Sequence, residues 1–275
     1  MRGKLAAAIA TALLFGLLAT PARAGEPVYY LSLGDSLAAS FQPRGPQDEG
    51  YSEQLFEIEQ AHIPVLQLVK MGCGGETSQA MVDGGSFCAY QHGSQLADAL
   101  AFIDDHPGQI GFITLTIGSN DLAVCQQHDL RYDLDCLPRA FDRVSGNVEL
   151  IVDLLRVATG QGVPIVGAAY QDPWIALWIA GPRGPRIALS NHEVFASLDD
   201  VLRDAYSHSG ALVADLWAAF HADDFTPVRS RPFGVVPTNV ALACAWTWAC
   251  VLGDVHPNSL GYGVLAGASA DALDT

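Results

Sequence analysis

Five short apolar runs, separated by longer stretches with helical spacing, most constrain how this 275-residue chain folds. The runs are rich in β-branched and aromatic residues, which is typical of buried strands. Strands that alternate with helices need crossover connections, and these produce a parallel sheet covered by helices on both faces. We therefore predict an α/β protein built as a three-layer α/β/α sandwich. The predicted strands are 28–33, 65–69, 110–117, 164–168 and 211–216, and the clearest predicted helices are 94–105, 138–158, 187–206 and 260–270.

The N-terminus predicts an export signal rather than a part of the fold. Arg2 and Lys4 precede an apolar run, and Ala22-Arg23-Ala24 has the small-x-small pattern of a cleavage site. The run, residues 5–19, is shorter than the roughly 20 residues that a membrane-spanning helix needs. An uncleaved anchor is the alternative. We predict a signal peptide over 1–24, cleaved after Ala24, and one domain over 25–275, secreted as a monomer without stable membrane insertion.

The acidity of the chain argues against binding to nucleic acid. The formal charge is −16, and removal of Arg2, Lys4 and Arg23 lowers it to −16 − 3 = −19 for the mature chain. Such a surface repels phosphate backbones and anionic headgroups. We expect a small-molecule or lipid partner and no nucleic-acid partner.

Six cysteines in an exported chain indicate disulfides. Six allow 15 pairings, and proximity along the chain favours three local ones. Their spacing does not suit a Cys-x-x-Cys metal or redox site, and a His-Glu-x-x-His motif is lacking, so we expect neither metal nor cofactor. The favoured pairs are Cys73–Cys88, Cys125–Cys136 and Cys244–Cys250.

Polar and glycine-rich segments follow the predicted strands. Because the carboxyl ends of parallel strands meet at one edge of the sheet, we expect these segments to lie together there, where ligands bind in open α/β sheets. They are 34–37 (Gly-Asp-Ser-Leu), 72–77 (Gly-Cys-Gly-Gly-Glu-Thr), 118–121 (Gly-Ser-Asn-Asp) and, after a longer irregular stretch, 254–258 (Asp-Val-His-Pro-Asn).

Four residues in these segments suit ester hydrolysis, and each also has a structural interpretation. Ser36 is a candidate nucleophile or a helix N-cap. His256 is a candidate base for that serine or a loop residue stacked on Pro257. Gly75 offers an unobstructed N–H to an oxyanion or simply forms a turn beside a disulfide. Asn120 is a candidate oxyanion donor or a turn residue.

Taken together, the segments resemble the signature blocks of the SGNH/GDSL hydrolase family, in the family's order. The resemblance implies that Ser36 is the nucleophile and His256 its base, and that Ser36, Gly75 and Asn120 form the oxyanion hole. It also implies the flavodoxin-like, five-stranded parallel sheet of the SGNH hydrolase fold. The cysteines and the export signal resemble the extracellular esterases and lipases of actinobacterial type in this family.

One position departs from the family pattern. The family usually has its acid three residues before the histidine, where this chain has Gly253, and the aspartate here is Asp254, two before. Either the Asp254 carboxylate orients His256 or a backbone carbonyl near 251–254 does so. We name Asp254 as the third catalytic residue because a carboxylate also stabilises the imidazolium.

The sequence thus predicts a secreted serine esterase or lipase that forms an acyl-enzyme on Ser36. A second hypothesis keeps the chemistry and changes the substrate to an acetylated glycan. A third is a non-catalytic secreted binding protein on the same fold.

Overall fold

A computed structural model describes residues 25–46 and 49–275 of the chain. The predicted signal peptide, 1–24, lies outside these residues. A five-stranded sheet with the order β4-β1-β5-β6-β7 forms the centre, and all its neighbouring strands run parallel. This arrangement confirms the predicted α/β class and the five-stranded parallel sheet. The strands are β1 (Val28–Gly34), β4 (Leu66–Lys70), β5 (Ile110–Thr116), β6 (Ile165–Ala168) and β7 (Leu212–Ala214).

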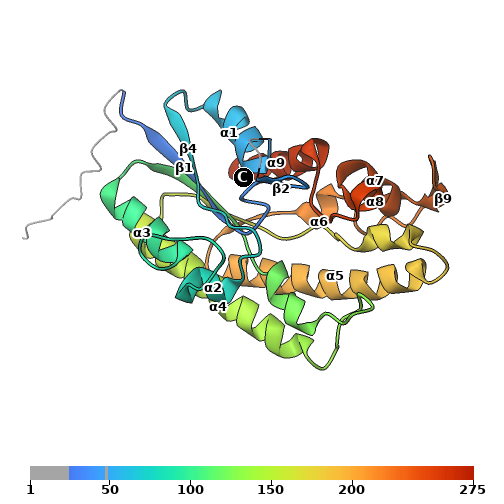
Figure 1. The fold of residues 1–275 in the computed structure, drawn as a ribbon. Helices are drawn as coiled ribbons and strands as arrows, with labels where there is room; N and C mark the ends of the chain where they lie inside the picture. Colours follow the sequence, from blue (N-terminus) through green and yellow to red (C-terminus); the bar gives the residue numbers. More distant parts are fainter. Residues whose placement is uncertain (1–24, 47–48) are drawn as a thin grey trace, which may run out of the picture.

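Helices cover both faces of the sheet (Figure 1). Helices α1 and α9 pack together on one face, and α3, α4 and α5 lie on the other. The inner strands β5 and β6 are buried almost without interruption, which explains why their sequences lack an apolar–polar alternation. The helices are α1 (Tyr51–Gln60), α2 (Ser78–Asp83), α3 (Gln95–Asp105), α4 (Leu137–Thr159), α5 (Gly184–His208) and α9 (Ser259–Leu273).

The stretch between β7 and α9, expected to be irregular, contains regular structure. Helix α7 is apolar on nearly all sides, so it has no helical period for a sequence pattern to detect. It packs with a 3₁₀ segment, η2, and a hairpin in a second apolar cluster around Ile175 and Val240. The elements are η2 (Ile175–Ile179), α6 (Leu216–Ala219), β8 (Pro227–Ser230), β9 (Gly234–Pro237), α7 (Thr238–Trp246) and α8 (Ala249–Leu252).

The strand order creates a switch point between β1 and β5. From β1 the chain crosses to β4 on one side and then returns to β5 on the other, so the connections after β1 and β5 diverge at the carboxyl ends of these strands, where open α/β sheets bind their ligands. The segments after β1, β4 and β5 all start at this edge. A short hairpin follows the first of them, and the 3₁₀ segment η1 follows β5. Their bounds are β2 (Phe41–Gln42), β3 (Gly45–Pro46) and η1 (Ser119–Cys125).

Candidate active site

Ser36 lies in the tight turn that ends β1. Gly34 has a φ of 127°, and a side chain there would overlap the backbone of Thr116 on β5. Glycine therefore lets the turn begin directly against the neighbouring strand. The next residue, Asp35, is buried, and its carboxylate accepts hydrogen bonds from the Leu37 N–H (2.9 Å) and the Tyr170 hydroxyl. Gly34 and Asp35, the two residues before Ser36, thus hold it in a half-buried position at the sheet edge.

Burial raises the pKa of Asp35 to about 7, although hydrogen bonds from Tyr170, Leu37 and Thr116 lower it. This buried carboxyl lies directly under the turn that carries Ser36. Sequence patterns made Ser36 a candidate but gave no pairing of Tyr170 with Asp35, because 135 positions separate these two residues.

His256 is oriented by the carboxylate two residues earlier. Its Nδ1 lies 2.6 Å from Oδ1 of Asp254, and the same oxygen accepts the His256 backbone N–H at 2.9 Å. Gly253 ends helix α8 in the left-handed conformation with a φ of 69°. Glycine is the residue that best adopts this left-handed cap conformation, so position 253 is a glycine here, and the carboxylate is supplied by the next residue, Asp254. In this structure the partner of the imidazole is therefore the Asp254 carboxylate rather than a backbone carbonyl near 251–254.

The imidazole lies next to the segment that starts at Ser36. The ring of Phe41 packs on His256 with 4.8 Å between ring centroids, and the Phe41 N–H donates to the Ser36 carbonyl at 2.9 Å. The Tyr262 hydroxyl fixes Phe41 from the other side through its carbonyl, at 2.6 Å. Phe41 and His256, 215 positions apart (256 − 41), therefore become neighbours, and Phe41 is bonded in turn to the Ser36 carbonyl.

The Ser36 hydroxyl forms no hydrogen bond with any residue in 25–46 or 49–275, so a serine–histidine bond is not made in this structure. Such catalytic bonds are often long without substrate and shorten when it binds.

The candidate oxyanion donors come from three connections. Gly75, after β4, has a φ of 77°, and Asn120 is on η1, after β5. The Asn120 Nδ2 donates to the Glu76 carbonyl at 2.8 Å, which places the carboxamide beside the residue that follows Gly75. Within the described residues, the N–H groups of Ser36 and Gly75 have no acceptor, so both are available to a ligand oxygen.

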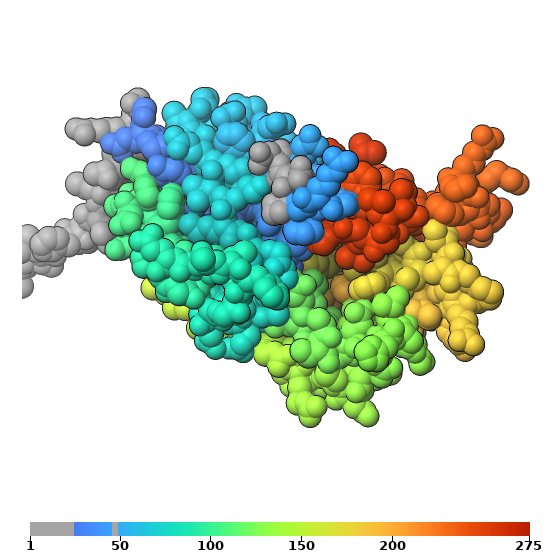
Figure 2. Space-filling model, in the orientation of Figure 1, coloured from blue at the N-terminus to red at the C-terminus, as the bar shows by residue number. Residues whose placement is uncertain are grey.

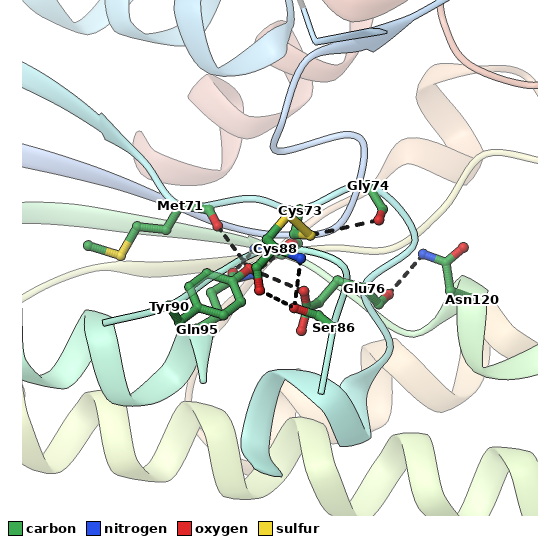
Figure 3. Close-up of a disulfide and its surroundings, with 10 residues drawn as sticks. Met71, Cys73, Gly74, Glu76, Ser86, Cys88, Tyr90, Gln95 and Asn120 are labelled. Carbon is green, nitrogen blue, oxygen red and sulfur yellow. Dashed lines mark hydrogen bonds between the residues drawn. A yellow bond between two sulfur atoms is a disulfide. The ribbon is translucent and has the colours of Figure 1, made fainter. Parts of the chain in front are cut away.

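A buried polar network joins two of these connections beneath the edge (Figure 3). The Gln95 amide pairs with the Gly34 backbone, accepting its N–H at 2.5 Å and donating to its carbonyl at 2.9 Å. Gln95 also donates to the Tyr90 hydroxyl at 2.8 Å, and Tyr90 donates to the buried Glu76 carboxyl at 3.1 Å. Burial raises the pKa of Glu76. The network therefore connects the residue after Gly75 to the turn that carries Ser36.

All three favoured disulfides are present in the structure. The Cys73–Cys88 bridge, drawn in Figure 3, closes the loop of residues 73–88, which includes Gly75. Cys244–Cys250 joins α7 to α8, just before Asp254 and His256. Two of the three bridges thus brace segments of the candidate site.

His192 lies outside this site and belongs to an ion-pair cluster. Its Nδ1 lies 2.9 Å from Asp172 and its Nε2 lies 3.2 Å from Asp223, so it ties α5 to the segments after β6 and α6. Burial lowers its pKa, but the hydrogen bond and charge of Asp172 together with Asp223 raise it overall. The described residues contain no group of three or more His, Cys, Asp or Glu side chains suited to a metal ion. They also contain no helix long and apolar enough to cross a membrane.

A model of the GDSL-like lipase/acylhydrolase family matches residues 32–264. The chain belongs to this family. The match spans the turn at Ser36, the loop at Gly75, η1 and the segment at His256, all within one family pattern. Curated protein sequences give no match.

Solved structures share the fold at low sequence identity. A catalytic mutant of an acetylxylan esterase from Geobacillus stearothermophilus is 17% identical with a TM-score of 0.57, over 90% of this chain and 94% of that chain. Phospholipase A1 from Streptomyces albidoflavus is 15% identical with a TM-score of 0.52, over 90% of this chain and all of that chain (100%). A Bacillus subtilis protein is 15% identical with a TM-score of 0.54, over 90% and 56% respectively. These likenesses confirm the SGNH hydrolase fold, and the family is one of ester hydrolases.

Proposed function

We propose that this chain is a secreted serine esterase that hydrolyses carboxylic esters through an acyl-enzyme on Ser36. The observation that carries the proposal is the position of His256, which pairs with Asp254 at 2.6 Å and packs on Phe41, five residues after Ser36. Three disulfides in one chain support export to an oxidising compartment. We further propose that cleavage after Ala24 releases a monomeric enzyme.

In the proposed reaction, Ser36 attacks the ester carbonyl while His256 accepts its proton. The N–H groups of Ser36 and Gly75 and the Asn120 amide hold the oxyanion, and one such donor contributes roughly 3–4 kcal/mol in the transition state. His256 then protonates the leaving alcohol. Water hydrolyses the acyl-enzyme by the same route, with Asp254 stabilising the imidazolium in both steps.

A fluorophosphonate probe and a chromogenic short-chain ester test this proposal. We expect the probe to label Ser36 and the ester to be hydrolysed. Ser36→Ala should lose the labelling and on the order of 10⁴- to 10⁶-fold of kcat. Ser207→Ala, an exposed serine on α5, is the control and should behave as wild type. A folded protein that neither labels nor turns over would refute the enzyme and favour a binding protein on this fold.

A second candidate is an esterase that acts on acetylated glycans. The acetylxylan esterase of Geobacillus stearothermophilus shares this fold, as does the phospholipase, so fold alone does not choose between the two substrates. Acetate release from acetylated xylan, compared with release of longer acids from simple and lipid esters, separates the candidates.

A further inference from the structure

Phe87 presents its ring to solvent beside the candidate oxyanion hole. It is 95% exposed, the most exposed large apolar side chain among the described residues. Its loop is fixed by the adjacent Cys88, which is bonded to Cys73. A methyl group placed on Gly75 would meet the Phe87 ring at 3.6 Å, so the ring borders the space that a side chain at that position would occupy. The apolar surface of Phe87 is therefore available to whatever molecule approaches Gly75.

A second aromatic ring lies against the preceding glycine. A methyl group on Gly74 would meet the Phe41 ring at 3.5 Å, and the same ring packs on His256. The Phe41 ring thus lies near Gly74, and the Phe87 ring lies near Gly75. In Figure 2 the surface is hollowed where the segment around residues 75–100, η1 and the C-terminal segments meet. Any group that extends from an acyl carbon near Gly75 towards solvent passes apolar rings.

Two polar groups near Phe87 on its loop already have hydrogen-bonding partners. The Ser86 hydroxyl is engaged with the Cys88 backbone, its oxygen 3.2 Å from the carbonyl and 3.3 Å from the N–H. The Tyr90 hydroxyl points to Glu76 beneath the loop, as Figure 3 shows. A sugar ring needs hydrogen-bonding partners as well as an apolar face, whereas an alkyl chain needs only the apolar face.

We propose that Phe87 contacts the acyl chain of the substrate and makes the enzyme favour acyl groups longer than acetyl. This inference rests on the proposed esterase function. Its physical basis is that an acyl chain laid against the ring removes apolar surface of both partners from water. An acetyl group is too short to reach past Gly75 and gains nothing from the ring.

An acyl-chain series on Phe87 variants tests the inference. Wild type, Phe87→Ser and Phe87→Leu are assayed on p-nitrophenyl esters from acetate to decanoate and on acetylated xylo-oligosaccharides. Val157→Ser, an 83% exposed apolar residue on α4, is the control for loss of exposed apolar surface. Thermal melting of each variant checks that the fold is kept.

We expect Phe87→Ser to lose about tenfold in kcat/KM on octanoate and decanoate and less than twofold on acetate. Phe87→Leu should recover most of that loss, and Val157→Ser should match wild type. An equal loss at every chain length, or no loss at any, overturns the inference. So does a loss confined to the acetylated sugar, which would make the ring a sugar platform. Failure of the wild type on every ester would instead refute the proposed function, and this inference with it.

Discussion

At the scale of single residues, the site depends on two carboxyl groups in different environments. Asp254 is partly exposed and accepts two hydrogen bonds from His256. Asp35 is buried beside Ser36, and its pKa is raised to about 7 by that burial. The Asp254 carboxylate is therefore suited to stabilise an imidazolium, whereas the Asp35 carboxyl stabilises the turn that carries Ser36.

Replacement of Asp254 by asparagine should separate the carboxylate from the backbone-carbonyl arrangement. The amide keeps the shape but neither stabilises the imidazolium nor selects the same tautomer. We expect kcat to fall by about 10²- to 10⁴-fold with little change in KM, measured on a short-chain chromogenic ester. If Asp254→Asn and Asp254→Ala keep most of the turnover, a carbonyl orients His256 instead.

The buried Asp35 should make stability depend on pH. Its folded pKa, about 7, lies above the unfolded value of about 3.9, so between these values the folded state binds more protons. The free energy of unfolding therefore falls as pH rises from about 4 to 7. The asparagine in Asp35→Asn cannot ionise. Between pH 5 and pH 8 the free energy of unfolding of this variant, measured by urea unfolding, should therefore decrease by roughly 1–3 kcal/mol less than that of wild type. Equal losses in the two proteins would exclude this role for Asp35.

At the scale of elements, the site is assembled from the connections after β1, β4 and β5. Their relative positions depend on shared buried partners, among which the Glu76–Tyr90–Gln95 network reaches the Gly34 backbone. On the other side of η1, the Asp121 carboxylate accepts the Ser78 N–H (2.7 Å) and hydroxyl (2.8 Å) and so holds η1 to α2. The positions of the candidate oxyanion donors therefore depend on several elements together.

Tyr90→Phe tests whether the network supports catalysis as well as folding. Loss of the hydroxyl removes a donor to the buried Glu76 carboxyl and one of the two acceptors of the Gln95 amide, at a cost of about 1–3 kcal/mol in stability. We expect kcat to fall by about 3- to 10-fold with KM within twofold, because the oxyanion donors shift by a small amount. Tyr29→Phe is the control, since the Tyr29 hydroxyl forms no hydrogen bond among the described residues. A lower melting temperature with unchanged kcat would assign the network to folding alone.

At the scale of the whole molecule, three local disulfides supplement the core around the parallel sheet. They span 15, 11 and 6 positions, so each constrains a short loop rather than linking distant parts of the chain. On the chain-entropy model each contributes about 2–3 kcal/mol.

Full reduction should therefore destabilise the enzyme without unfolding it at room temperature, because the sheet and its helices form a large core. We expect a lower urea midpoint in the presence of a phosphine reductant. Activity should also decline, because the loops at Cys73 and Cys244 are no longer held in place. A reduced enzyme with an unchanged midpoint would show that the bridges do not contribute to equilibrium stability.

The sequence by itself determined the order of strands and helices, the edge at which the glycine-rich segments meet, and the candidate residues Ser36 and His256. These depend on local periodicity and short motifs, which are properties of neighbouring residues. Only the tertiary structure decided that Gly253 caps α8 and that the Asp254 carboxylate lies 2.6 Å from the His256 imidazole. It also decided the pairing of Gln95 with Gly34 and of Tyr170 with Asp35, across 61 and 135 positions. Such pairs follow from how packed elements bring side chains together, and periodicity carries no information about them.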